Sequence, residues 1–179
     1  MNPRRGVPVR AALVLVAALV LQISLVSDLR IAGAIGDLML VVVIAAGLTG
    51  GADRGVTYGF AAGVLYDLVL DTPFGLSALT YALVGYAVGL VGAALGRTSG
   101  WWPLVIAAAA AMVQTVLYTC LGILIGTAFP LDDVPGIGLA LAVVAALLVT
   151  PALRVLWWVH GHSEPDRLEV YLPMSGARR

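Results

Sequence analysis

Long apolar stretches separated by short polar or glycine-rich segments dominate this sequence. A helix needs roughly 20 mainly apolar residues to cross a hydrocarbon core about 30 Å thick. The pattern predicts six membrane-spanning helices, over residues 9–27, 38–51, 56–70, 76–95, 102–128 and 137–159. The second of these stretches is short for a full crossing. The prediction is therefore an all-α, polytopic membrane protein.

Short polar segments that contain proline and glycine mark the ends of the predicted helices. Residues 71–75 read Asp-Thr-Pro-Phe-Gly, in which proline and glycine both interrupt a helix. The other connections are equally short, so none of them holds a soluble domain. We expect one transmembrane domain over residues 1–159 and a cytoplasmic tail over residues 160–179.

The composition agrees with residence in a membrane. Apolar residues make up 61% of the chain, charged residues only 11%, and the mean hydropathy is +1.02. A soluble domain has about 25% charged residues. The composition thus excludes an ordinary soluble domain, a disordered chain and a disulfide scaffold.

The positions of the basic residues predict the orientation. All ten basic residues are arginines, and arginine near a span end favours the cytoplasmic side. With a cytoplasmic N-terminus and six spans, nine arginines lie inside and only Arg30 lies outside. An odd number of spans would mix the two groups. The sequence therefore predicts a multi-pass protein of a cytoplasmic membrane with both termini inside the cell.

A glycine repeat is the most informative pattern within the predicted spans. Gly55, Gly59 and Gly63 recur every four residues, and Asp67 and Asp71 continue the same spacing. Positions four apart lie on one slowly turning face of a helix. Small residues on such a face allow close approach of another helix. That helix could belong to the same chain, to a partner protein or to a second copy in a homodimer.

Asp67 stands out among the carboxylates because apolar residues follow it. A charge within the bilayer is costly and usually faces protein or water. One interpretation is an aspartate that reaches interfacial water. The alternatives are a salt bridge to a partner, a proton site and a polar anchor.

Further small and polar residues occur in the fourth and fifth predicted spans. Tyr81, Gly85 and Gly89 again follow a four-residue spacing and predict a second smooth face, packed against the third span. Gln114 lies in an apolar environment and needs a hydrogen-bond partner. An interhelical hydrogen bond and a contact to a solute are both open for it.

Motifs for several catalytic and binding classes are absent from the sequence. There is no glycine-rich phosphate loop, no HExxH pair and no serine nucleophile motif with a membrane histidine. Both histidines, His160 and His162, fall in the predicted tail. That tail is too weakly basic to indicate nucleic-acid binding. We therefore expect no enzyme activity, no metal or other cofactor, no nucleic-acid partner, and membrane lipid as the surroundings.

Residues 35–96 resemble the rod shape-determining protein MreD family. The resemblance rests on GVTYGFAAGVLYD at residues 55–67, FGLSAL at 74–79 and LVGY at 83–86. A glycine-rich helix that ends in aspartate, a Gly-Leu turn and a Gly-Tyr pair form that family's pattern. IGDL at residues 35–38 is similar to the family's Pro-Asp-Leu entry to the second span, with Gly36 in place of proline.

The resemblance implies a non-enzymatic scaffold of the bacterial elongation machinery, which determines cell shape. Members of the family associate with MreC, a single-span membrane protein. Through it they connect to the MreB cytoskeleton and to the glycosyltransferase and transpeptidase that build lateral peptidoglycan. The family fold is similar to that of substrate-binding subunits of energy-coupling-factor vitamin transporters. A solute-binding subunit of such a transporter is therefore the alternative function.

The predicted orientation can be tested by cysteine labelling. With Cys120 replaced by serine, a cysteine placed at position 132 should react with a membrane-impermeant maleimide added to intact cells. The predicted loop there lies outside. Labelling only after the cells are opened would contradict the six-span, N-inside prediction.

Overall fold

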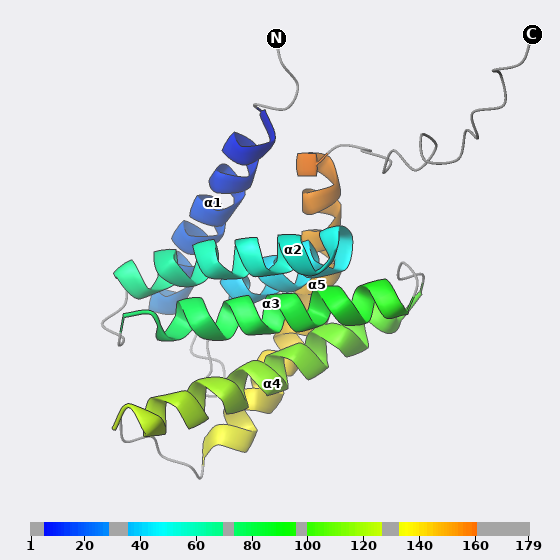
Figure 1. Cartoon of the computed structure of the whole chain (residues 1–179). Coiled ribbons are helices and arrows are strands. Elements are labelled where there is room, and N and C mark those ends of the chain that lie inside the picture. Colours follow the sequence, from blue (N-terminus) through cyan, green and yellow to red (C-terminus); the bar gives the residue numbers. More distant parts are fainter. Residues whose placement is uncertain (1–5, 29–35, 70–73, 96–99, 127–132, 161–179) are drawn as a thin grey trace, which may run out of the picture.

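The computed structural model describes residues 6–28, 36–69, 74–95, 100–126 and 133–160 (Figure 1). These residues form an all-α structure without strands. Its five helices are α1 (Gly6–Asp28), α2 (Leu38–Val69), α3 (Leu76–Ala94), α4 (Trp102–Leu124) and α5 (Val134–His160).

Four of these helices, α2 to α5, are long and apolar enough to cross a membrane. The apolar stretch of α1, Val9–Ser24, falls just short of the same length. Several long apolar helices in one chain are the signature of a multi-pass membrane protein. The polytopic all-α class is therefore confirmed.

The prediction of six separate spans is corrected at α2. This helix contains both the second and the third predicted spans, and Gly51, at φ 78° and ψ −171°, is its non-helical residue. A positive φ of this kind suits glycine and few other residues. The sequence suggested a polar loop over residues 50–55, but one glycine makes the break and the helix resumes at once.

The chain folds back on itself at Gly51. In a straight helix, Gly47 and Gly55 would be about 12 Å apart along the axis. Instead, a Cβ built on Gly55 would lie 3.2 Å from the Cα of Gly47, and both glycines face Gly85. The two halves of α2, residues 38–50 and 52–69, therefore lie side by side.

The first half of α2 forms the centre of the molecule. Every residue from Met39 to Leu48 is buried. α2 as a whole contacts all four other helices, and α3 most extensively. α4 and α5 form a second closely packed pair. A helix that is apolar all round is typical of a position enclosed by other helices. Figure 1 shows α3 running alongside α2, with α4 on the far side of α3.

Backbone meets backbone where α2 packs on α3. Side chains added at Gly55, Gly59 or Gly63 would collide with the main chain of α3. Side chains added at Gly85 or Gly89 would collide with the main chain of α2. All five glycines therefore face the chain's own helices, and close packing of this kind stabilises helix pairs where lipid supplies no hydrophobic driving force.

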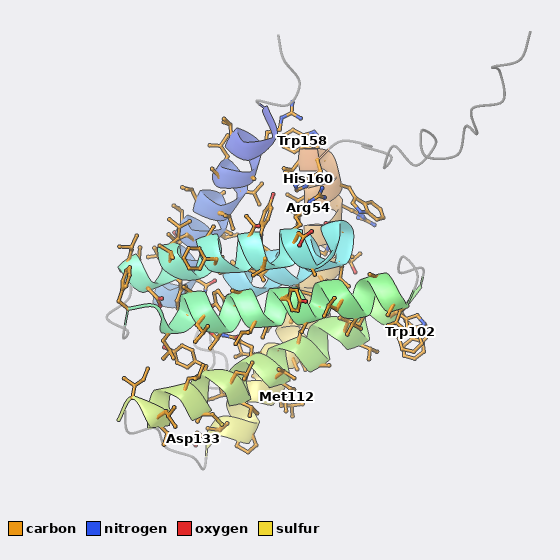
Figure 2. All side chains as sticks on the ribbon, viewed as in Figure 1. Arg54, Trp102, Met112, Asp133, Trp158 and His160 are labelled. Carbon is orange, nitrogen blue, oxygen red and sulfur yellow. The ribbon has the colours of Figure 1, made fainter. Side chains whose placement is uncertain are left out.

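Large apolar and aromatic side chains cover the outer surface (Figure 2). Trp101 and Trp102 stack near the start of α4, and Trp157 and Trp158 are exposed near the end of α5. Tryptophan is enriched where a membrane meets water. The exposed surface therefore suits lipid along the helices and an interface at their ends.

The α2–α3 contact makes a prediction about two matched substitutions. Alanine is about 1 kcal/mol better than glycine inside a helix. In Gly59→Ala, however, the new Cβ would collide with the backbone of Tyr81 and Ala82. We expect this variant to lose about 1–3 kcal/mol of stability, the usual cost of overpacking. The measurement is the melting temperature of the purified protein in detergent.

Gly136→Ala in α5 is the control, because nothing lies within 4 Å of a Cβ at that position. This variant should melt at or slightly above the wild-type temperature. A Gly59→Ala protein that melts as high as Gly136→Ala would contradict the backbone contact.

Candidate functional site

Asp67 lies near the C-terminal end of α2 and caps the N-terminus of α3. Its carboxylate accepts hydrogen bonds from the backbone N–H groups of Gly75 at 2.9 Å, Ser77 at 3.2 Å and Ala78 at 3.2 Å. The first N–H groups of a helix have no partner inside that helix. α3 has no capping side chain of its own, because Gly75 stands at its N-cap. Asp67 therefore has the geometry of a polar anchor.

The carboxylate of Asp67 is buried as well as hydrogen-bonded, with 5% of the residue exposed. Negative charge at a helix N-terminus is also favoured by the helix dipole. Of the readings open for Asp67, the polar anchor is the one whose contacts are observed in the structure. Asp71, the next residue in the four-residue spacing, lies outside the described residues.

The start of α2 has a similar arrangement, which the sequence analysis did not identify. Asp37 precedes the helix and accepts from the Leu40 N–H at 3.0 Å. The side chain of Gln22, on α1, accepts from the Met39 N–H at 3.2 Å. Two signals were present in the sequence: an aspartate just before an apolar run, and a lone glutamine inside an apolar helix.

Tyr81 links α3 to the start of α2. Its hydroxyl donates a hydrogen bond to the Asp37 carboxylate, and its ring lies against Tyr66 with centroids 5.9 Å apart. Only 2% of Tyr81 is exposed. Burial raises the pKa of Asp37, and the hydrogen bond from Tyr81 opposes that rise. Tyr81 therefore makes an interhelical hydrogen bond in addition to filling the core.

Gln114 links α4 to the first turn of α3. Its amide nitrogen donates to the Thr80 hydroxyl at 2.9 Å, and that hydroxyl donates to the Ser77 carbonyl at 3.2 Å. Ser77 is also one of the residues whose N–H is held by Asp67. The network therefore joins Asp67 on α2 to Gln114 on α4 through the start of α3.

Taken together, the polar side chains form an anchoring cluster, which we define as Gln22, Asp37, Asp67, Tyr81 and Gln114. Each of them bonds to another helix or to the first turn of one. Buried backbone groups need such partners because lipid offers none. The five glycines line the α2–α3 contact, where Gly59 meets the backbone of Tyr81. The chemistry of the cluster is that of hydrogen bonding between helices.

The described acidic residues do not form a metal site. Across the helices and turns that the structure describes, no three histidine, cysteine, aspartate or glutamate residues come together in a way that could hold a metal ion. Asp37 and Asp67 are instead bonded to helix N-terminal N–H groups.

Replacing Asp67 should destabilise the protein more than removing the same charge elsewhere on α2. In Asp67→Asn, an NH2 group replaces one carboxylate oxygen and faces one or two of the three backbone N–H donors. We expect a loss of about 1–3 kcal/mol, as for a buried donor left without its partner. The control is Asp53→Asn on the exposed surface of α2, which should stay within about 0.5 kcal/mol of the wild type. Equal melting temperatures for the two variants would show that the anchor contributes nothing.

The comparison with protein families agrees with the sequence resemblance. The family model of rod shape-determining protein MreD matches residues 5–157, which span α1 to α4 and nearly all of α5. No curated protein matches the chain. No solved structure matches it either, so the expected similarity to energy-coupling-factor subunits is not confirmed. Because the family match covers most of its length, the chain belongs to the rod shape-determining protein MreD family.

Proposed function

We propose that this rod-shape-determining membrane protein is a non-enzymatic scaffold of the bacterial elongation machinery. It would bind an MreC-like single-span protein and, through it, connect the MreB cytoskeleton to lateral peptidoglycan synthesis. The family match over residues 5–157 is the observation that carries this proposal. The internal bonding of the buried polar side chains also favours a rigid helix assembly over a reaction site.

The glycine faces are poor candidates for the partner surface. Gly59 and Gly63 already contact the backbone of α3, so a partner helix could reach them only by displacing α3. A loss of partner binding on substitution of either glycine by leucine would therefore follow from damage to the fold. The same argument applies to a homodimer built on these faces.

α1 offers a better surface for a partner helix. Large apolar side chains are exposed along it at alternating spacings of four and three residues: Val9, Leu13, Val16, Val20 and Ile23. This is the spacing by which one helix packs lengthwise against another. α1 has few contacts within the chain, to α2 and α5. We assign this stripe, called the α1 stripe below, to the MreC-like partner.

We propose that both termini lie inside the cell. The fold-back at Gly51 supports an even number of crossings. Arg10 and Trp158 lie together, which brings the start of α1 next to the end of α5. The two terminal helices therefore have their outer ends on the same side.

The alternative function, a solute-binding transporter subunit, would use a pocket among Asp67, Tyr81 and Gln114. All three side chains are already bonded to neighbouring helices. Mass spectrometry of the purified protein separates the two functions. A small molecule retained through purification would favour the transporter subunit.

The scaffold proposal is tested by co-purification with the cognate MreC-like protein, followed by rescue of rod shape in cells that lack this chain. We expect the wild type to retain the partner in detergent. Val16→Trp in the α1 stripe should reduce the retained partner several-fold, because it changes the shape of that surface while it remains apolar.

Leu147→Trp is the matched control, since Leu147 is an exposed apolar residue of α5 outside the stripe. It should retain the partner as the wild type does. Absence of the partner from a correctly inserted wild-type protein would contradict the scaffold proposal. Equal retention by the two tryptophan variants would contradict only the assignment to α1.

A further inference from the structure

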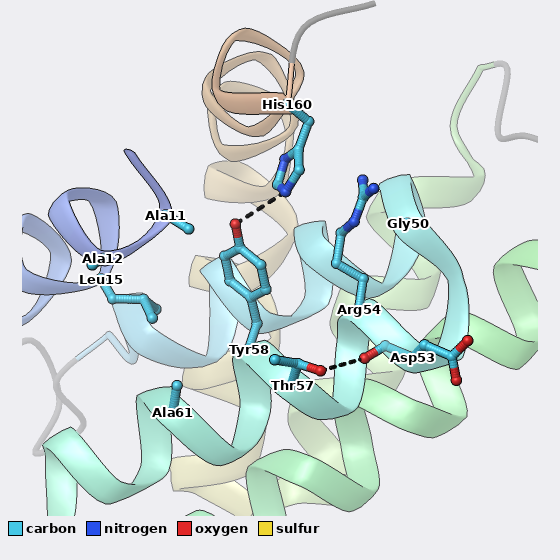
Figure 3. Close-up of a pocket in the computed structure, with 10 residues that line it drawn as sticks. All are labelled: Ala11, Ala12, Leu15, Gly50, Asp53, Arg54, Thr57, Tyr58, Ala61 and His160. Carbon is cyan, nitrogen blue, oxygen red and sulfur yellow. Dashed lines mark hydrogen bonds between the residues drawn. The ribbon is translucent and has the colours of Figure 1, made fainter. Parts of the chain in front are cut away.

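A groove of about 610 Å³ opens where α1, α2 and α5 meet (Figure 3). One part of its lining is apolar and small, with Ala11 and Leu15 from α1 and Ala61 from α2. The other part is polar, with Asp53, Arg54, Thr57, Tyr58 and His160. This volume is within the range of about 300–1,000 Å³ that small-molecule sites occupy. No step of the proposed scaffold function uses it.

Arg54 is held toward this groove by the glycine beneath it. A Cβ built on Gly50 would collide with the Cδ and Nε atoms of Arg54, so the absence of a side chain at Gly50 leaves room for the arginine. The carboxylate of the adjacent Asp53 points away from the guanidinium (Figure 3). Among the described residues, no carboxylate forms an ion pair with Arg54. The guanidinium of Arg54 therefore lines the groove without an ion pair to Asp53, which also belongs to the lining.

His160 and Tyr58 form the second polar wall. The Nδ1 atom of His160 lies 3.0 Å from the Leu156 carbonyl, which can only accept, so Nδ1 carries a proton. The other nitrogen, Nε2, lies 3.2 Å from the Tyr58 hydroxyl. The sequence analysis placed His160 in the tail, whereas it is the last residue of α5 and bonds to α2.

The groove lies beside residues that are typical of a membrane–water interface. Trp158, two residues before His160, is exposed, and the guanidinium of Arg10 lies 5.5 Å from the centre of its ring. Arg10 in turn directly precedes Ala11 of the groove lining. Tryptophan and arginine together at a helix end are typical of the headgroup region.

We propose that this groove binds the headgroup of an anionic phospholipid. The lipid phosphate would lie between the Arg54 guanidinium and the Tyr58–His160 pair, and its glycerol and upper acyl chain would cover Ala11, Leu15 and Ala61. An arginine that forms no ion pair with another described residue matches a phosphate in charge and in hydrogen-bond geometry. The apolar floor beside it favours a lipid over a soluble anion. Basic pockets between membrane helices bind anionic headgroups on the same principle.

The test measures lipid binding by native mass spectrometry of the full chain in detergent, titrated with phosphatidylglycerol. Phosphatidylcholine with the same acyl chains is the uncharged comparison. We expect the wild type to bind phosphatidylglycerol at least tenfold more tightly than phosphatidylcholine. Arg54→Gln should weaken phosphatidylglycerol binding about tenfold, which corresponds to about 1.4 kcal/mol. Arg154→Gln is the matched control, because Arg154 is exposed on α5 and does not line the groove.

Arg154→Gln should keep phosphatidylglycerol binding within about twofold of the wild type, since isolated surface charges contribute little. Gly50→Ala keeps every charge but displaces Arg54, and should weaken phosphatidylglycerol binding as Arg54→Gln does. Melting temperatures confirm that each variant is folded.

Displacement of the lipid by glycerol phosphate at equal concentration would show a soluble-anion site and overturn the proposal. Equal effects of Arg54→Gln and Arg154→Gln, or equal binding of the two lipids, would also overturn it. None of these outcomes depends on MreC or on which leaflet the groove faces.

Discussion

The contact between the main chains of α2 and α3 is the constraint on which the rest of the structure depends. Where Gly59 meets Tyr81 and Gly55 meets Gly85, there is no space for a side chain between the helices. This approach sets the position of α3, and with it the position of every polar side chain that α3 carries. Tyr81 can reach Asp37 because α3 lies this close to α2.

Helix ends inside the molecule are satisfied across the structure rather than within each helix. Asp67 of α2 serves the start of α3, and Gln22 of α1 serves the start of α2. In water, either helix end could bond to solvent, but within a membrane an unbonded N–H group is costly. Each of these helices therefore depends on the one before it, because removing the preceding helix would leave backbone N–H donors without partners.

Part of this arrangement was predictable from the sequence. The four-residue spacing of Gly55, Gly59 and Gly63 predicted a smooth face, since that spacing follows from helix geometry alone. The apolar residues that follow Asp67 predicted that its side chain faces protein or water. The partner itself was not predictable, because three backbone N–H groups of the next helix leave no mark on the sequence. The fold-back at Gly51 was missed because a polar, glycine-rich segment looks the same whether it forms a loop or a single break.

The fold-back at Gly51 also bears on how the protein enters the membrane. A helix over residues 38–50 is about 20 Å long, well short of a hydrocarbon core of about 30 Å. In the folded protein its surface is covered by neighbouring helices, so most of its length does not contact lipid. During synthesis it would emerge before α3, the helix with which α2 packs most extensively. The central segment therefore depends on later parts of the chain for the burial of its apolar surface.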